Sequence, residues 1–406
     1  MKERKVEGLC LIFDYGGYPF IRSLSRSLSK NGLNVMYLFV QNISNRITNL
    51  EKNAQDPESF QIHNLKMSRW YSAYKYSFFI RFLLELHFCS RAFLFMLRSR
   101  PKVVIVCNMP SVVQFSVWLG ALLSGARFIS WVQDLYGYAV YTLLERKLFG
   151  LGFLGGKALI GLDNFVLRHS DHVVGISAAF KEYFLNVTKV RPERISIIHN
   201  WAPLEKIPSL SKKNGWSQRF GLDDSFVFLY SGTLGLKHNP SSLIELAKGL
   251  SHLPDVLLVV VSEGRGKEFL RTEAAKNELK NLRLFDLQSE SLYPEILASA
   301  DVLITLLERD AGKFSVPSKV SSYLCAERAQ LMIGPKMNLA SQILLENECG
   351  LVVDSGDAAH VLKSALLLYE DRELRSSMAV AGRRYAEQEF EIENVLKKFE
   401  RVVSEF

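Results

Sequence analysis

Short runs of apolar residues, many of them β-branched, alternate along the whole chain with longer amphipathic stretches. Such runs are typical of buried parallel strands, and the stretches between them have the spacing of helices that cover a sheet. In the first half they predict strands at 9–13, 35–40, 103–107, 128–133, 172–176 and 195–199. In the second half they predict strands at 226–231, 256–261, 282–285, 302–306, 330–333 and 350–353. The alternation indicates an α/β fold built on parallel sheets.

The chain has 406 residues, a length at which one hydrophobic core normally gives way to two. We therefore predict two Rossmann-like domains, an N-terminal one over residues 1–202 and a C-terminal one over residues 217–390. The polar stretch 203–216 is interpreted as a linker. The last segment, 391–406, is expected to be a helix that packs back on the N-terminal domain.

Composition excludes some classes of protein and limits others. With 48% hydrophobic and 23% charged residues the chain is not intrinsically disordered. Its five cysteines are scattered and odd in number, which favours reduced, buried thiols over a disulfide framework. Residues 1–200 carry 25 Lys and Arg against 13 Asp and Glu, whereas residues 201–406 carry 25 against 29. The first half should therefore face an anionic partner: a membrane surface, a phosphorylated substrate or a nucleic acid.

Two stretches of the first half bear on membranes. Residues 103–126 contain no charged side chain, but Pro110 and several polar residues interrupt them, so we favour a strand, a loop and a buried helix over a transmembrane span. Residues 61–100 are basic and rich in aromatic residues. We expect this region to bind an anionic membrane surface without crossing it, through Arg69, Trp70, Tyr71 and Lys75. The alternative is a core helix with a solvated basic face.

Candidate phosphate-binding groups follow two strands of the second half. The strand 226–231 leads into a loop with Gly232, Thr233 and Lys237, in which backbone amides and an ammonium group could approach an anion. Further on, Pro317 and Ser318 resemble a helix start, with Lys319 in the first turn. The chain has no Asp-x-Asp motif and no cluster of histidines. A diphosphate would then be held by amides and lysines, and we expect no metal and no other cofactor.

These blocks resemble the retaining glycosyltransferases of family 4, and most closely the colanic-acid and capsule branch. The resemblance covers most of the chain and includes Gly16-Gly17, the block 131–136, the strand 170–177, the close of the first domain at 199–201 and the Pro-Ser-Lys block at 317–319. It implies a GT-B fold, in which two Rossmann-like domains face each other across a deep cleft.

The resemblance also implies roles for single residues. Lys237 and Lys319 would hold the donor diphosphate, and Lys237 would also stabilise the leaving group. Further donor contacts would come from Gly17, Gly232, Thr233, the Ser318 amide and the backbone of Leu287. Asp134 would orient the acceptor or assist catalysis, although a capping Asp at a strand end is an equally good interpretation. Ser322 stands where the family has a glutamate that grips the ribose.

The function that follows is transfer of a hexosyl or N-acetylhexosaminyl group from a UDP-sugar to a polyprenyl diphosphate-linked acceptor, with retention. Such an enzyme would serve bacterial surface polysaccharide synthesis, in the cytoplasm and peripherally on the inner face of the cytoplasmic membrane. Two alternatives remain open: a sugar-nucleotide epimerase and a non-catalytic glycosyltransferase-like scaffold. Nucleic acid is not an expected partner, because no module that reads nucleic acid is recognisable.

Overall fold

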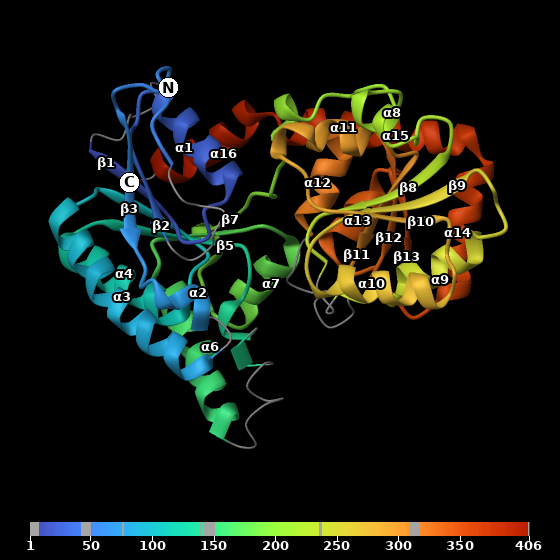
Figure 1. Cartoon of the computed structure of the whole chain (residues 1–406). Helices are drawn as coiled ribbons and strands as arrows, with labels where there is room; N and C mark the ends of the chain where they lie inside the picture. The colour runs from blue at the N-terminus through green and yellow to red at the C-terminus, as the bar shows by residue number, and fades with distance from the viewer. Residues whose placement is uncertain are drawn as a thin grey trace. The chain divides into compact units, whose positions relative to one another are not determined.

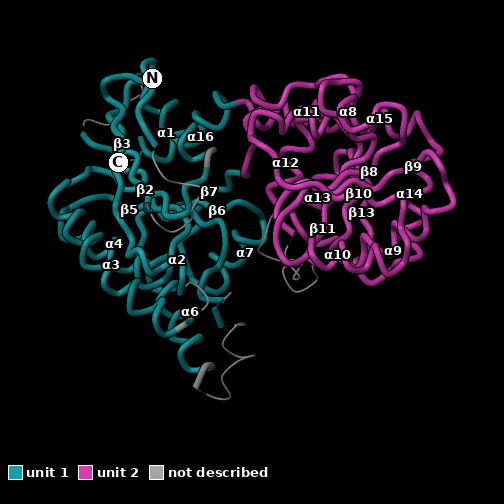
Figure 2. Tube along the Cα trace, in the orientation of Figure 1, with its two compact units in different colours: residues 1–199, 392–406 teal, residues 200–391 magenta. Residues whose placement is uncertain are grey.

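The computed structural model describes residues 8–41, 50–74, 77–138, 140–141, 151–234, 238–307, 317–404 and 406. The chain forms two compact units (Figure 2). Unit 1 comprises residues 1–199 and 392–406, and unit 2 comprises residues 200–391. The predicted linker, 203–216, falls within unit 2, where it contains the short 3₁₀ helix η2 (Leu204–Lys206) and the start of α8 (Gly215–Arg219).

Unit 1 is built on a seven-stranded parallel sheet in the order β3-β2-β1-β4-β5-β6-β7 (Figure 1). The strands are β1 (Leu9–Asp14), β2 (Asn34–Gln41), β3 (Phe60–Lys66), β4 (Val103–Cys107), β5 (Arg127–Val132), β6 (His172–Gly175) and β7 (Ile195–Ile197). Its helices are α1 (Pro19–Lys30), α2 (Trp70–Tyr74), α3 (Phe78–Ser99), α4 (Ser111–Ser124), α6 (Leu151–His169), α7 (Ala178–Asn186) and α16 (Ile392–Ser404), with the 3₁₀ turn η1 (Pro192–Arg194). Six of these strands were predicted, and β3 was missed.

Unit 2 repeats the arrangement with six parallel strands in the order β10-β9-β8-β11-β12-β13. The strands are β8 (Phe226–Ser231), β9 (Val256–Val261), β10 (Leu282–Phe285), β11 (Val302–Leu306), β12 (Ala329–Ile333) and β13 (Gly350–Val353). Besides α8 its helices are α9 (Ser241–Leu250), α10 (Arg265–Lys276), α11 (Tyr293–Ala298), α12 (Ser318–Cys325), α13 (Leu339–Glu346), α14 (Ala358–Glu370) and α15 (Arg372–Glu389), with the 3₁₀ turn η4 (Glu290–Leu292). All six strands were predicted. The prediction of two parallel-sheet Rossmann-like domains is confirmed.

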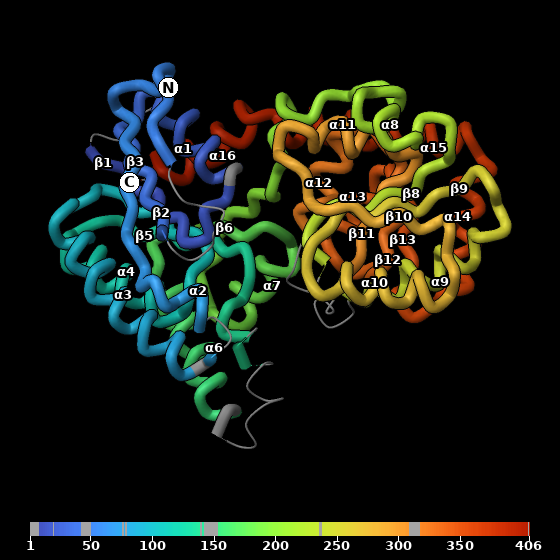
Figure 3. The backbone as a smooth tube through the Cα atoms, in the orientation of Figure 1, coloured from blue at the N-terminus to red at the C-terminus, as the bar shows by residue number. Residues whose placement is uncertain are grey.

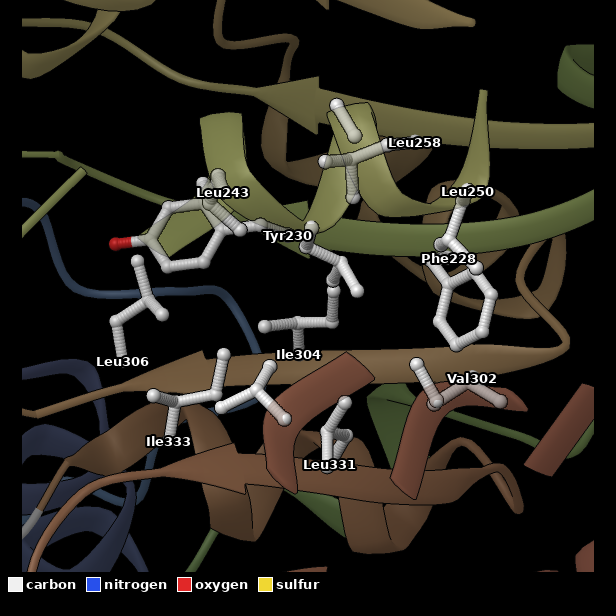
Figure 4. Close-up of a cluster of buried hydrophobic side chains, with 14 of the residues drawn as sticks. Phe228, Tyr230, Leu243, Leu250, Leu258, Val302, Ile304, Leu306, Leu331 and Ile333 are labelled. Carbon is white, nitrogen blue, oxygen red and sulfur yellow. The ribbon is translucent and has the colours of Figure 1, made fainter. Parts of the chain in front are cut away.

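Side chains at alternate positions of the strands form the core of unit 2. Phe228 and Tyr230 on β8, and Val302 and Ile304 on β11, are two residues apart and point to the same face (Figure 4). Leu243 of α9 packs on that face, and all five side chains are fully buried. This packing fixes where β8 ends and therefore where the loop after it begins.

The uncharged stretch 103–126 forms strand β4 and helix α4, as predicted. The helix ends at Gly125, whose φ of 75° is the left-handed conformation that glycine adopts most readily. Among the described residues, no helix combines the length and the apolar composition needed to span a bilayer.

The C-terminal helix α16 belongs to unit 1, although all of unit 2 precedes it in the sequence. It lies beside α1, which Figure 3 shows as red against blue. Asn31, at the end of α1, donates a hydrogen bond of 2.8 Å to Glu400. Phe399 is completely buried, and its ring centroid lies 4.6 Å from that of Trp131 on β5.

Candidate donor and acceptor sites

Two candidate donor residues of unit 2 meet at the end of β8. Gly232 has φ 127°, which side chains rarely allow, and a Cβ built on it would lie 2.6 Å from the Cε atom of Lys319. The Lys319 side chain therefore crosses directly over the Gly232 backbone, and its ammonium lies 5.1 Å from the ring centre of Tyr230. A glycine at this position is required because any side chain would displace the lysine.

Sheet topology explains why these residues meet. β8 lies between β9 and β11. The strands that follow β8 in the sequence, β9 and β10, lie on one side of it, and the later strands β11, β12 and β13 lie on the other side. In open parallel sheets ligands bind at such a switch point, beyond the carboxyl ends of the strands. The loop after β8 and the start of α12 both occupy this place, and α12 begins at Ser318, as its Pro317-Ser318 sequence predicted.

Hydrogen bonds from two buried tyrosines hold the loop after β8. The Tyr323 hydroxyl accepts from the Ser231 amide (3.0 Å) and donates to the Ser231 carbonyl (3.2 Å). The Tyr230 hydroxyl donates to the Thr233 carbonyl at 3.0 Å. Ser262 donates to the Gly232 carbonyl at 2.7 Å. Sequence reasoning missed these supporting residues, because each acts through a hydrogen bond to the backbone of the loop and none belongs to a motif.

The remaining donor candidates have different surroundings. Thr233 is exposed and donates to Glu263 at 3.3 Å, while Leu287, half-buried, lies just beyond β10. Ser322 forms a hydrogen bond to Tyr293, whose pKa burial raises to about 12 while that bond opposes the rise. The Ser322 hydroxyl is thus already engaged within unit 2. Lys237 lies outside the described residues.

In unit 1 the predicted glycine loop depends on a buried carboxylate. Asp14, at the end of β1, accepts hydrogen bonds from the amides of Gly16 (3.0 Å) and Gly17 (2.8 Å). Its other oxygen accepts from the Tyr37 hydroxyl at 2.8 Å. Burial raises the pKa of Asp14 to about 6, and these hydrogen bonds oppose the rise. Gly17 adopts φ 69° at this turn. Sequence reasoning named Gly17 and missed Asp14.

Asp134 lines a pocket of unit 1 with a volume of about 340 Å³, at the end of β5. Its carboxylate is exposed and accepts from the Asn108 side-chain amide at 3.1 Å. The side-chain oxygen Oδ1 of Asn108 in turn accepts from the Asp134 backbone amide, also at 3.1 Å. Asn108 therefore fixes both the backbone and the side chain of Asp134.

A second carboxyl group, Asp163 of α6, lines the same pocket. It accepts from the Gly137 amide at 2.8 Å, and burial raises its pKa to about 6. An exposed carboxylate and a buried one with a raised pKa could orient an acceptor hydroxyl and accept its proton. Asp163 was missed because it stands within a helical stretch with no motif around it.

The four residues expected at a membrane surface differ in their exposure to solvent. Arg69 and Trp70 are exposed, Trp70 by 65%. Tyr71 is buried, and its hydroxyl donates to Glu85 at 3.0 Å, so its predicted contact with a membrane surface is wrong. It faces inward because α2 packs on α3, where Tyr71 belongs to the same core cluster as Phe88. Lys75 lies outside the described residues.

Comparison with known proteins identifies both units. Residues 19–201 match the family model described as glycosyl transferase 4-like domain, and residues 212–385 match that of glycosyl transferases group 1. WcaI of Escherichia coli (strain K12), named as a colanic acid biosynthesis glycosyl transferase, is 28% identical over 290 residues, which cover 69% of this chain and 68% of WcaI.

Solved structures show the same fold over nearly the whole chain. Sucrose-phosphate synthase from Thermosynechococcus elongatus superposes with a TM-score of 0.76 at 12% identity, over 98% of this chain and 99% of that one. HepE of Anabaena in complex with UDP-glucose superposes with a TM-score of 0.68 at 12% identity, over 98% and 100%. Glycosyltransferase family models match both units, and WcaI is a relative from colanic acid biosynthesis. The chain therefore belongs to the GT-B glycosyltransferases of the family 4 type, near the colanic acid branch.

Proposed function

We propose that this glycosyltransferase moves a hexosyl or N-acetylhexosaminyl group from a UDP-sugar to a polyprenyl diphosphate-linked acceptor, with retention, in surface polysaccharide synthesis. The observation that carries the donor assignment is Lys319, whose side chain crosses Gly232 at the switch point of the unit 2 sheet. An ammonium there can neutralise charge that develops on a departing nucleoside diphosphate. The UDP-glucose named in the HepE complex supports a UDP-sugar as donor.

The remaining parts of the donor proposal rest on the family resemblance and on the residues. Lys237 and the Ser318 amide would complete the diphosphate site, and the Leu287 backbone would meet the base. Because the chain lacks an Asp-x-Asp motif, the reaction would need no metal ion. Gly17 would approach the donor from unit 1, on a turn that Asp14 holds.

The acceptor would bind to unit 1. Asp134 and Asp163 line one pocket there, with Asn108 fixing Asp134, so the acceptor hydroxyl would lie between the two carboxyl groups. The basic and partly exposed region around Arg69 and Trp70 would bring this unit to the inner face of the cytoplasmic membrane, where a polyprenyl-linked acceptor lies.

The test is transfer from a panel of UDP-sugars to polyprenyl diphosphate-linked saccharides, with UDP release measured and the new linkage read by NMR. An α-linked product from an α-linked donor would demonstrate retention. Lys319→Ala should lower kcat/KM by about ten- to a few hundred-fold, because a charge-assisted hydrogen bond contributes roughly 1.5–3 kcal/mol. Lys336→Ala, at an exposed lysine of the same unit, is the matched control.

Other outcomes would contradict the proposal. A new nucleotide sugar formed without acceptor would indicate an epimerase. No turnover with any donor, together with no UDP binding, would indicate a non-catalytic scaffold. Full activity of Lys319→Ala would refute the assignment of the donor site.

A further inference from the structure

A second pocket of unit 1 lies between α3, the start of α4 and α6. It has a volume of about 440 Å³ and a polar side formed by Arg81, Glu85, Ser111 and Tyr136. Its apolar side includes Phe82 and Leu159. Tyr136 also lines the pocket of Asp134, so the two pockets share a wall.

The guanidinium of Arg81 is held rigidly at the polar side. Its Nε atom donates to Glu85 at 2.8 Å, and its Nη2 atom donates to the Tyr136 hydroxyl. The rings of Tyr71 and Tyr136 lie 5.9 and 5.6 Å from its Cζ atom. Among the described residues no hydrogen bond is formed by the remaining nitrogen, Nη1. Arg81 therefore offers a pre-oriented donor edge to a ligand.

Ser111 also lines the polar side of the pocket. Its side chain is buried and forms a hydrogen bond to Asp163 of α6. The donor that remains for a ligand is therefore the Nη1 edge of Arg81. A guanidinium edge binds phosphate oxygens strongly, because the hydrogen bond is assisted by opposite charges.

The apolar side of the pocket continues on to the surface. Phe79, Phe82 and Leu86 occupy positions i, i+3 and i+7 of α3 and so form one stripe. Phe82 is half-buried in the pocket, whereas Phe79 and Leu86 are exposed by 70% and 44%. A water-soluble phosphate would gain nothing by contacting this apolar stripe, whereas a hydrocarbon chain attached to the phosphate would bury apolar surface against it.

We propose that this pocket binds the phosphate and the first prenyl units of a prenyl-phosphate lipid, with Arg81 on the phosphate and the stripe of Phe79, Phe82 and Leu86 along the chain. The inference rests on the proposed function, because such a lipid would be the carrier end of the acceptor. The shared wall at Tyr136 would then place the sugar end of that acceptor toward Asp134.

The probe is farnesyl phosphate below its critical micelle concentration, with binding measured by calorimetry. Wild-type protein should bind it saturably, whereas farnesol and inorganic phosphate should each bind at least ten-fold more weakly. Equal binding of farnesol would overturn the phosphate assignment, and equal binding of inorganic phosphate would overturn the lipid assignment.

Variants separate a specific effect from misfolding. Removing Arg81 alone would leave Glu85 buried without its cation, so Arg81→Gln is combined with Glu85→Gln. The double variant should bind farnesyl phosphate about ten- to a hundred-fold more weakly. Leu159→Trp should block the pocket sterically and abolish binding, while Arg98→Gln, at an exposed arginine of the same helix, should leave binding unchanged.

UDP binding distinguishes failure of this inference from failure of the proposed function. It should stay unchanged in every variant, because none of the changed residues belongs to the proposed donor site, to which unit 2 contributes Lys319 and Gly232 and unit 1 contributes Gly17. Sugar transfer by a wild-type protein that does not bind farnesyl phosphate would overturn the pocket assignment and leave the proposed function standing. Wild-type affinity of both pocket variants would overturn the assignment as well.

Discussion

Gly232 is the residue at which backbone conformation and donor binding depend on each other. Gly232→Ala adds a Cβ atom 2.6 Å from the Cε atom of Lys319, at a φ of 127° that alanine rarely adopts. The lysine must move, so we expect a loss of UDP affinity of about ten-fold or more, which corresponds to one charge-assisted hydrogen bond. Calorimetric titration of UDP measures this change.

Gly221→Ala is the matched control for backbone strain. Gly221 also has a positive φ, 60°, but nothing lies within 4 Å of the position that its Cβ would take. It should lose roughly 1 kcal/mol of stability through strain and keep its UDP affinity. An equal loss of affinity in both variants would show that strain alone, and not the position of Lys319, affects the site.

Asp14 should make the stability of unit 1 depend on pH. Burial raises its pKa to about 6 from an ordinary value of 3.8, so between these values the folded state binds more protons than the unfolded state. This contribution to stability is complete below pH 4 and is lost as pH rises toward 6, by about 3 kcal/mol in total.

Asp14→Asn should remove this dependence while keeping an acceptor for the Gly16 and Gly17 amides. Hydrogen exchange of β1 and β2 amides between pH 4.5 and 7, corrected for intrinsic exchange rates, is the measurement. The wild type should lose protection across this range relative to Asp14→Asn, and Glu182→Gln, at an exposed position, should behave like the wild type. Parallel profiles for wild type and Asp14→Asn would contradict the prediction.

At the scale of elements, α16 should stabilise a domain that is distant in sequence. Phe399→Ala empties a fully buried site against Trp131 and should cost about 3–5 kcal/mol in unit 1. Because Trp131 is three residues before Asp134, activity should fall as well, while UDP binding by unit 2 should persist. Thermal unfolding measures the first effect, with exposed Lys397→Ala as control. Wild-type stability of Phe399→Ala would contradict this account of the helix.

Strands with nearly continuous apolar runs were predictable because burial on both faces leaves few polar positions in them. β3 could not be predicted in this way, because it is an edge strand that buries only Phe60 and Leu65, and its other positions are at least partly exposed. Tyr71 was misjudged because an aromatic residue in a basic segment has the same pattern whether its ring faces outward or inward. Asp163 accepts from an amide 26 residues away, which no local pattern encodes. Asp14 accepts from the nearby amides of Gly16 and Gly17, but its hydrogen bond from Tyr37 on the neighbouring strand joins residues that are distant in sequence.

At the scale of the molecule, the donor chemistry predicts independence from metal ions. Sugar transfer should continue at full rate in excess EDTA, because lysines and backbone amides would carry the charge that a divalent ion carries elsewhere. Initial rates with and without EDTA, followed by addition of Mg²⁺ or Mn²⁺, test this. An absolute requirement for either ion would contradict the arrangement proposed for the donor.

Membrane binding is a second property of the whole molecule. The protein should float with anionic liposomes, and binding should weaken in high salt, since each cationic side chain near such a surface contributes about 1 kcal/mol. Changing Arg69, Trp70 and Phe79 together to serine should weaken flotation strongly. Leu367→Ser, at an apolar residue of unit 2 exposed by 44%, should not. Equal binding to neutral liposomes would contradict the prediction that electrostatic attraction to anionic lipids contributes to membrane binding.

The membership of α16 in unit 1 determines the order in which the protein can fold during synthesis. Unit 2 is a continuous segment, 200–391, and is translated before residues 392–406. Unit 1, although translated first, lacks until then the helix that covers Trp131 and contacts α1. The core of the N-terminal domain can therefore be completed only after the whole of the domain encoded behind it has been translated.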